Sequence, residues 1–194
     1  MTAVVIVGGG PAGLMAAQTL AEAGATVDLY DAMPSVGRKF LLAGKGGLNL
    51  THSEAFDAFA GRYRERREVL EPLLRDFGPE ALRAWAQGLG VDTFVGTSGR
   101  VFPKDLKAAP LLRAWLARLR QAGVRFHMRH RLVGLVGDAE AGFALRFATP
   151  QGESTVTSAT VLLALGGASW PQLGSDGAWV PLLGELGVEV APLA

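Results

Sequence analysis

The chain has 194 residues, 49% of them hydrophobic, and a formal net charge of +1. This length and apolar fraction exclude a disordered chain and suffice for a buried core, while the small net charge argues against a strong general attraction to nucleic acid or membrane. The chain has no cysteine, which excludes disulfides, thiolate metal sites and iron–sulfur clusters built from its own side chains, and also the dithiol of flavin disulfide reductases.

The first predicted unit is a strand, a glycine turn and a helix. Residues 4–7 are apolar and β-branched, and an alanine-rich helix is predicted over about 12–23. Gly8, Gly10 and Gly13 stand between strand and helix in the G-x-G-x-x-G spacing, which permits a tight turn, close approach of a diphosphate and close helix packing. The free amides and positive dipole end of such a helix attract phosphate. The context therefore predicts dinucleotide binding.

A second strand is predicted over residues 26–31, after Gly24 ends the first helix. It closes with Asp31, near the expected distance of roughly 20 residues after the glycines. This carboxylate can accept hydrogen bonds from ribose hydroxyls, and it would repel a 2′-phosphate, which disfavours NADP at this site. The alternative is a solvated acid at the end of a strand.

A glycine-rich stretch over residues 36–52 follows where a simple NAD-binding domain would continue with a helix and a strand. Glycine lets the main chain approach a flat ligand, and Arg38, Lys39 and Lys45 could hold a phosphate or stabilise negative charge on a reduced ring. Asn49 offers a neutral hydrogen-bonding group. The alternative is an exposed loop with solubilising cations.

The remaining predicted elements alternate helices with short strands. They are helices from Ser53 to about Phe77 and from Pro79 to near Gly88, two short strands within 91–103, an amphipathic helix over about 106–122, a strand over 124–128, an antiparallel meander over 131–160 and a buried parallel strand over 160–165.

The last strand exits into Gly166 and Gly167. Ligands of doubly wound sheets bind beyond the carboxyl ends of the parallel strands. We therefore expect this exit to line the same crevice as the first glycine turn, with an ordinary glycine-rich turn as the alternative.

Histidines and arginines give weaker signals. His52 could act as an acid or base beside a ring, with helix capping or surface hydrogen bonding as the favoured alternative. His127 and His130 are three apart near a strand, so we expect opposite faces and structural roles. The arginines within 62–67 could contact RNA, but a solvated helix face balanced by acids is favoured. No metal-ligand spacing is present.

Several motifs together carry a family resemblance. The segments GGGPAG, GRKFLLAGKGGLNLTHSE, SGRVFPKDLKAAPLL and LALGGASWPQLGSDG, with Asp31, resemble the bacterial BaiN/RdsA-type NAD(P)/FAD-dependent oxidoreductases, which include aminoacetone-oxidase-like flavoproteins. The resemblance covers essentially the whole chain. It implies an α/β, three-layer FAD/NAD(P)-binding Rossmann-like domain with a parallel sheet, helices and a small antiparallel β-meander.

The resemblance also implies domain limits. Residues 1–180 would form the N-terminal part of the FAD-binding domain, with a helical excursion over about 53–90 and the meander over about 131–160. Residues 181–194 would begin an inserted domain, and the rest of that domain and a C-terminal segment contacting FAD would be lacking.

The resemblance further implies a set of FAD contacts: adenosine diphosphate at the first glycines, ribose at the acid, adenine at main chain after the 124–128 strand, and flavin near the asparagine. The family often has Glu where this chain has the shorter Asp31. The implied cofactor-binding residues are Gly8, Gly10, Pro11, Ala12, Gly13, Asp31, Ala32, Arg38, Lys39, Gly46, Gly47, Asn49, Arg131, Leu132, Gly166 and Gly167.

The sequence therefore favours a cytoplasmic FAD-dependent oxidoreductase whose flavin is reduced by NAD(P)H or by an amine-like or other small organic substrate. Three alternatives stay open: an NAD-binding dehydrogenase without flavin, a non-catalytic dinucleotide-binding module, and an RNA-modifying flavoenzyme. We assign no catalytic residue and no metal. We expect no membrane partner, disfavour a nucleic-acid partner, and leave the oligomeric state open.

Overall fold

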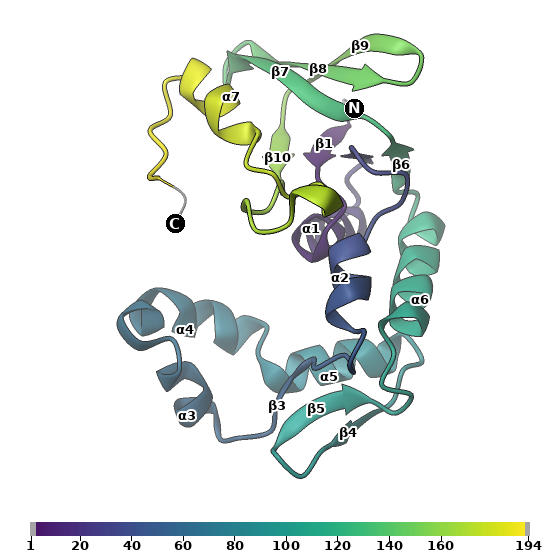
Figure 1. Cartoon of the computed structure of the whole chain (residues 1–194), viewed down its shortest axis with the longest axis vertical. Helices are drawn as coiled ribbons and strands as arrows, with labels where there is room; N and C mark the ends of the chain where they lie inside the picture. The colour runs from purple at the N-terminus through teal and green to yellow at the C-terminus, as the bar shows by residue number, and fades with distance from the viewer. Residues whose placement is uncertain (1–2, 193–194) are drawn as a thin grey trace. The chain divides into compact units, whose positions relative to one another are not determined.

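The computed structural model describes residues 3–192, and its elements are shown in Figure 1. The chain forms two compact units: unit 1 runs to Phe40 and resumes at Leu119, and unit 2 comprises Leu41–Arg118. Two helices cross these limits, α2 (Arg38–Ala43) and α6 (Ala108–Gln121).

Unit 1 contains both sheets that frame the predicted cofactor site. Its elements are β1 (Val4–Val7), α1 (Pro11–Glu22), β2 (Val27–Asp31), β6 (Arg125–Met128), β7 (Arg131–Asp138), β8 (Gly142–Thr149), β9 (Gly152–Ser158), β10 (Val161–Leu163), the 3-10 turn η2 (Pro171–Leu173) and α7 (Trp179–Glu185).

The parallel sheet of unit 1 has the order β10-β1-β2-β6. β1 lies inside this sheet, and Val5, Ile6 and Val7 are buried, which explains why this strand is a continuous apolar run and not an alternating one. β10 occupies one edge of the sheet and runs parallel to β1, as predicted. Its residues are only half-buried, so the prediction that this strand is buried is wrong.

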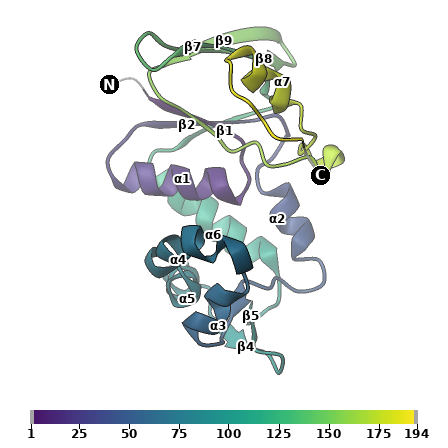
Figure 2. The same ribbon diagram turned by 90° about the vertical axis from the view of Figure 1, so that its left-hand side faces the viewer.

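Unit 1 has three layers, which Figure 2 shows as the meander, the parallel sheet and α1 in succession. The antiparallel meander β7-β8-β9 packs its Leu135, Leu145 and Phe147 on Val7 and Tyr30 of the sheet. α1 packs on β1 and β2. Each fully buried side chain of this size contributes about 1.5–3 kcal/mol, so both layers are held by apolar burial. The predicted three-layer fold is confirmed.

α1 ends as its sequence predicts. Gly24 has φ +84°, its amide donates to Ala21 O at 3.0 Å, and the amide of Ala25 donates to Leu20 O at 2.9 Å. These two bonds are a Schellman motif, which needs a residue in the left-handed region and therefore favours glycine.

Unit 2 contains a small antiparallel sheet and short helices. Its elements are β3 (Thr51–His52), α3 (Phe56–Gly61), the 3-10 turn η1 (Arg64–Arg66), α4 (Arg67–Asp76), α5 (Pro79–Gly88), β4 (Thr93–Val95) and β5 (Arg100–Pro103). The sheet has the order β3-β5-β4, and Trp85 meets buried Trp115 edge-to-face with ring centroids 4.8 Å apart.

One prediction in this part of the chain is wrong. The single helix expected from Ser53 to Phe77 is divided into α3, η1 and α4, because Arg64 adopts φ +49°, which no α-helix accommodates. The glycine-rich stretch 36–52 contains α2 and β3. α5 and the β4–β5 hairpin match their predictions. Among residues 3–192, no helix combines the length and apolar character needed to cross a membrane.

Candidate dinucleotide-binding site

Two glycines of the first turn are required by packing. Gly8 has φ +111°, and a Cβ there would lie 2.2 Å from Ala164 O at the exit of β10. A Cβ on Gly13 would lie 1.9 Å from Gly8 O. The amide of Ala164 also donates to Val7 O at 2.8 Å. The turn is therefore folded against the end of β10, as expected from the two glycine exits.

Gly10 differs from these two glycines because the space around its Cβ position is open. Gly10 is the N-cap residue of α1 and has an extended backbone (φ −78°, ψ −179°). Pro11 follows it in the first turn, and no side chain among the described residues caps this end of the helix. A Cβ on Gly10 would meet nothing within 4 Å among the described residues. The first intrahelical bond runs from Leu14 N to Gly10 O, so the amides of Ala12 and Gly13 have no helical acceptor. This open corner fits a diphosphate.

Asp31 links the two loops that border this corner. Its Oδ2 accepts from the amide of Gly9 at 2.6 Å, and its Oδ1 accepts from the amide of Met33 at 2.7 Å. Each carboxylate oxygen keeps a further lone pair for a ribose hydroxyl. Burial raises the pKa of Asp31 above its ordinary value, although both amides and the charge of Arg38 oppose the rise.

Gly9 is a residue of this site that sequence reasoning missed. A Cβ on Gly9 would lie 2.3 Å from Val36 Cγ1 and 2.8 Å from Asp31 Oδ2. The third consecutive glycine was the available signal.

Arg38 begins α2 beside the glycine turn. The preceding Gly37 donates its amide to Gly9 O at 2.8 Å. Arg38 Nε is buried and has no hydrogen-bond partner within residues 3–192, a state it shares with Trp179 Nε1. A buried donor without a partner costs about 1–3 kcal/mol, and a phosphate oxygen would satisfy it.

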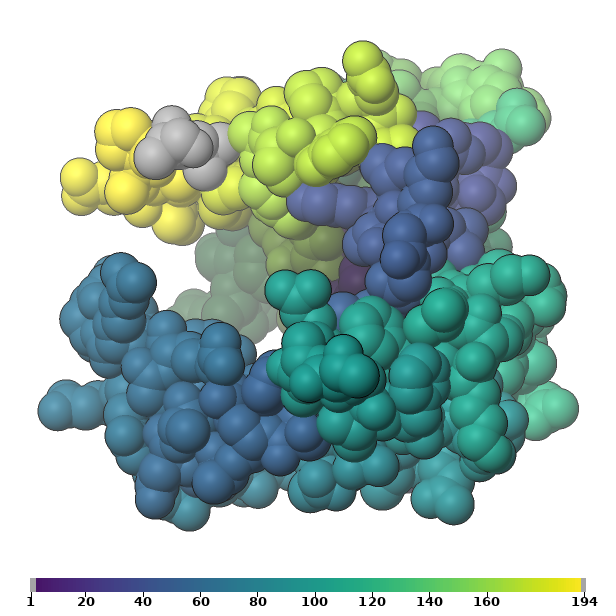
Figure 3. Space-filling view, turned by 60° about the horizontal axis from the view of Figure 1, so that its bottom comes forward, coloured from purple at the N-terminus to yellow at the C-terminus, as the bar shows by residue number. Residues whose placement is uncertain are grey.

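The segment after β10 lies beside the loop after β2. Lys39 Nζ donates to Ser169 Oγ at 2.8 Å, and a Cβ on Gly174 would lie 3.2 Å from Met33 Cγ. Residues 33–40 and 166–178 lie side by side on the surface of unit 1 (Figure 3). Ser175 Oγ donates to Gly167 O at 2.8 Å, which fixes the main chain after Gly166.

The loop after β6 reaches the same edge. The amides of Arg129 and His130 donate to Met33 O and Asp31 O at 3.1 and 2.9 Å. Arg131 and Leu132, expected in this loop, are instead the first residues of β7. Arg131 Nη1 donates to Asp176 Oδ2 at 2.9 Å, and Leu132 packs on the core.

His127 and His130 do not point to opposite faces, which corrects the sequence-based expectation. Their ring centroids are 5.9 Å apart because β6 ends at Met128 and Arg129 takes φ +61°. His127 stacks on Tyr30 at 4.3 Å.

His127 also completes an ion-paired cluster on Asp28. Its Nε2 lies 2.8 Å from Asp28 Oδ1, and Arg125 donates two bonds to the same carboxylate at 2.7 and 2.6 Å. Burial alone would raise the pKa of Asp28, but these partners hold it below its ordinary value. Both histidines thus have structural surroundings.

His52 likewise has both ring nitrogens in use. Nδ1 accepts from the amide of Glu54 at 3.2 Å, so Nε2 carries the proton and donates to Ser98 O at 3.0 Å. A Cβ on Gly99 would lie 2.6 Å from this ring. The geometry favours surface hydrogen bonding over acid–base chemistry for His52.

The remaining predicted contacts lie in unit 2. A Cβ on Gly46 would meet nothing within 4 Å among the described residues. Gly47 has φ +114°, and a Cβ there would lie 3.8 Å from the Phe102 ring. With its amide nitrogen oriented as donor, Asn49 donates to Thr51 O at 2.9 Å. Contact of these residues with a flavin stays a prediction, as does the ligand role of Lys45.

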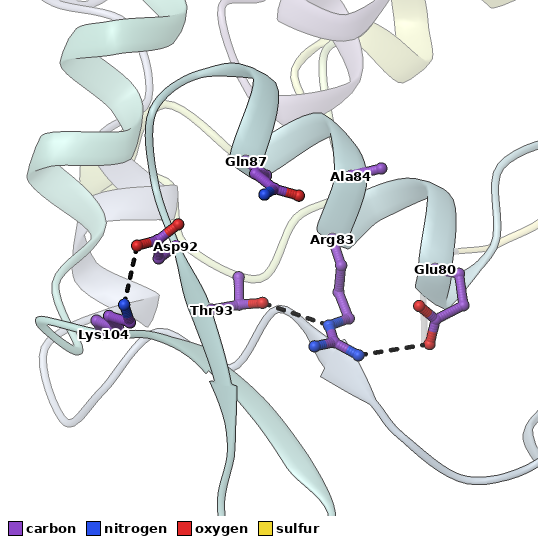
Figure 4. Close-up of a pocket in the computed structure, with 7 residues that line it drawn as sticks. All are labelled: Glu80, Arg83, Ala84, Gln87, Asp92, Thr93 and Lys104. Carbon is purple, nitrogen blue, oxygen red and sulfur yellow. Dashed lines mark hydrogen bonds and ion pairs between the residues drawn. The ribbon is translucent and has the colours of Figure 1, made fainter.

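Unit 2 also has a surface pocket of about 370 Å³, drawn in Figure 4. Its cations have partners inside the pocket: Arg83 Nε lies 3.3 Å from Thr93 Oγ1, and Lys104 Nζ lies 2.9 Å from Asp92 Oδ2. Glu80 lies 3.5 Å from Arg83. With this balanced lining, the pocket shows no preference for an anion. Within the described residues, no group of three or more His, Cys, Asp or Glu could hold a metal ion.

Comparison with known proteins supports the fold described above. A family model described as the HI0933-like protein Rossmann domain matches residues 2–194. The crystal structure of 3-ketosteroid-Δ4-(5α)-dehydrogenase from Rhodococcus jostii RHA1 is similar to this chain, with 17% sequence identity and a TM-score of 0.74. The similarity covers 97% of this chain and 54% of the dehydrogenase chain. A flavocytochrome c3 fumarate reductase gives 19% identity and a TM-score of 0.73, with 97% and 41% covered.

A carotenoid φ-ring synthase of Streptomyces griseus is 40% identical over 81 residues, which are 39% of this chain and 15% of that protein. The chain thus spans about half or less of the length of these similar proteins.

Proposed function

Because the chain belongs to the HI0933-like family, we propose that it is the dinucleotide-binding part of an FAD-dependent oxidoreductase and holds FAD without a covalent bond. The observation that carries this proposal is the open corner at the start of α1. There, Gly10 leaves space and the helix presents amides without acceptors.

Each residue around the corner has a defined task in this proposal. The amides of Ala12 and Gly13 bind the diphosphate, Asp31 accepts from ribose hydroxyls, and the buried Arg38 Nε donates to a phosphate oxygen. The other predicted cofactor contacts of unit 1 would complete this part of the site, and those of unit 2 stay separate predictions. When bound, FAD supplies the electron-transfer chemistry, and these residues bind and orient it.

FAD is favoured over NAD alone by the architecture of unit 1. A second mononucleotide-binding half does not follow β2. The parallel sheet is instead combined with the meander β7-β8-β9, in the three-layer arrangement that the family resemblance implies. The fold similarity to a flavocytochrome reductase and a ketosteroid dehydrogenase supports the same choice.

We include in the proposal a small organic substrate, NAD(P)H as electron donor and a cytoplasmic location. Asp31 would repel the 2′-phosphate of NADPH in the FAD corner, so a nicotinamide donor would have to bind elsewhere. Transient-state reduction of the flavin by NADH and by NADPH, measured separately, tests the choice of donor.

The cofactor itself is tested by release from the purified protein. We expect a yellow protein that absorbs at about 450 nm and releases FAD on denaturation. If the protein is isolated without cofactor, FAD and NAD are titrated into it separately. Binding of NAD without FAD, or of neither nucleotide, would contradict the proposal.

A further inference from the structure

Helix α4 of unit 2 exposes a stripe of apolar side chains. Val69 is 67% exposed, Leu73 is 61% exposed, and Phe77, just after the helix, is 42% exposed. Residues four apart lie on the same face of a helix. Single exposed apolar residues are ordinary on protein surfaces, whereas three at this spacing form one continuous contact surface, which we call the α4 stripe.

The charges of α4 are divided between two sides of the helix. Arg67 and Arg75 both pair with Glu71 at 2.7 and 2.6 Å, away from the stripe. Arg66 precedes Val69 by three residues and Asp76 follows Leu73 by three, so both lie near the stripe at its two ends. Within residues 3–192, neither Arg66 nor Asp76 has an ion pair.

Arg66, Val69, Leu73 and Asp76 are arranged symmetrically along the chain, so they can pair with the same residues of a second copy that runs in the opposite direction. Arg66 and Asp76 are equally distant from position 71, and so are Val69 and Leu73. An antiparallel copy of the helix would place its Asp76 opposite Arg66 and its Leu73 opposite Val69. Two-fold symmetry would repeat both contacts.

We propose that the α4 stripe is the surface through which two copies of this chain associate, with their α4 helices antiparallel. Arg66 and Asp76 flank the stripe at its two ends, and Glu65, four residues before Val69, lies near the Arg66 end. A uniformly acidic peptide or an anionic membrane would therefore meet the like charges of Glu65 and Asp76. A second copy pairs both Arg66 and Asp76. The stripe is short compared with a standard interface of about 1,600 Å², so the dimer is weak and its population depends on protein concentration.

Sedimentation velocity over a wide range of protein concentration tests this proposal, with circular dichroism as a check of folding. We expect Leu73→Ser to abolish the dimer. Val136→Ser, at a valine of β7 that is 62% exposed, should leave it unchanged. Arg66→Asp or Asp76→Arg should each weaken the dimer roughly tenfold, because two pairs become repulsive.

The charge-swapped double variant Arg66→Asp/Asp76→Arg distinguishes self-association from binding to another partner. It should restore the dimer, because only a second copy carries both changes. A monomer at every concentration, a dimer indifferent to Leu73→Ser, or no rescue by the double variant would overturn the proposal. Binding of phosphatidylglycerol vesicles through the stripe without dimerisation would overturn it in favour of a lipid surface.

Discussion

Replacing Gly10 by valine should separate cofactor binding from folding. The backbone of Gly10 (φ −78°, ψ −179°) is open to any residue, and its Cβ position meets no described atom within 4 Å. We therefore expect the free energy of unfolding to change by less than about 0.5 kcal/mol, as for surface substitutions away from special features.

The same side chain would stand where the diphosphate meets the amides of Ala12 and Gly13. Loss of two hydrogen bonds to a charged group costs about 1.5–3 kcal/mol each. Since 1.4 kcal/mol corresponds to about tenfold in affinity, FAD should bind at least roughly a hundredfold more weakly.

Titration of flavin fluorescence against the purified protein measures this loss, and urea denaturation measures stability. Gly184→Val is a matched control, because Gly184 in α7 also has open space around its Cβ position and no positive φ, and lies outside the predicted contacts. Equal FAD affinity of Gly10→Val and the parent chain would refute the placement of the diphosphate. An equal loss in Gly184→Val would also refute the argument.

Three further substitutions test the site and its support. Gly13→Ala places a methyl group 1.9 Å from Gly8 O and should lower the free energy of unfolding by about 1–3 kcal/mol in urea; unchanged stability would show that the turn relaxes freely. Arg38→Met removes the unpartnered buried donor, so FAD should bind about tenfold more weakly without loss of stability; a fall in both would assign it a structural role. Arg125→Met removes two bonds to Asp28 and should lower the free energy of unfolding modestly near neutral pH, because the Arg125 side chain is largely exposed. The folded-state pKa of Asp28 is depressed, so the stabilisation from its ionised form is present above the unfolded-state pKa and is lost as pH falls through the folded-state pKa. The unfolding free energies of parent and variant should therefore converge in acid. A difference that stays constant with pH would show that the loss does not come from the Asp28 ion pair.

Sequence reasoning succeeded where structure depends on neighbouring residues. β1, α1 and β2 follow from an apolar run, a glycine turn and the Gly24 stop, and α5 follows from Pro79 and its periodicity. It failed between 53 and 77, where apolar residues stand on both sides of the charged run 64–68 and Arg64 takes a left-handed backbone conformation. Periodicity measures which face of a helix is apolar, and it does not detect a single residue that leaves the helix.

The sequence by itself determined the strand–turn–helix unit, because hydrogen bonds within a turn or helix join residues close in the chain, and its motifs indicated the family. The cofactor contacts that the family resemblance implies stay predictions. Only the tertiary structure decided that Gly9 must admit Asp31, that Arg38 keeps a buried donor without a partner, and that Arg125 meets Asp28. These contacts depend on how distant strands are ordered and aligned in the sheet, which local patterns do not specify.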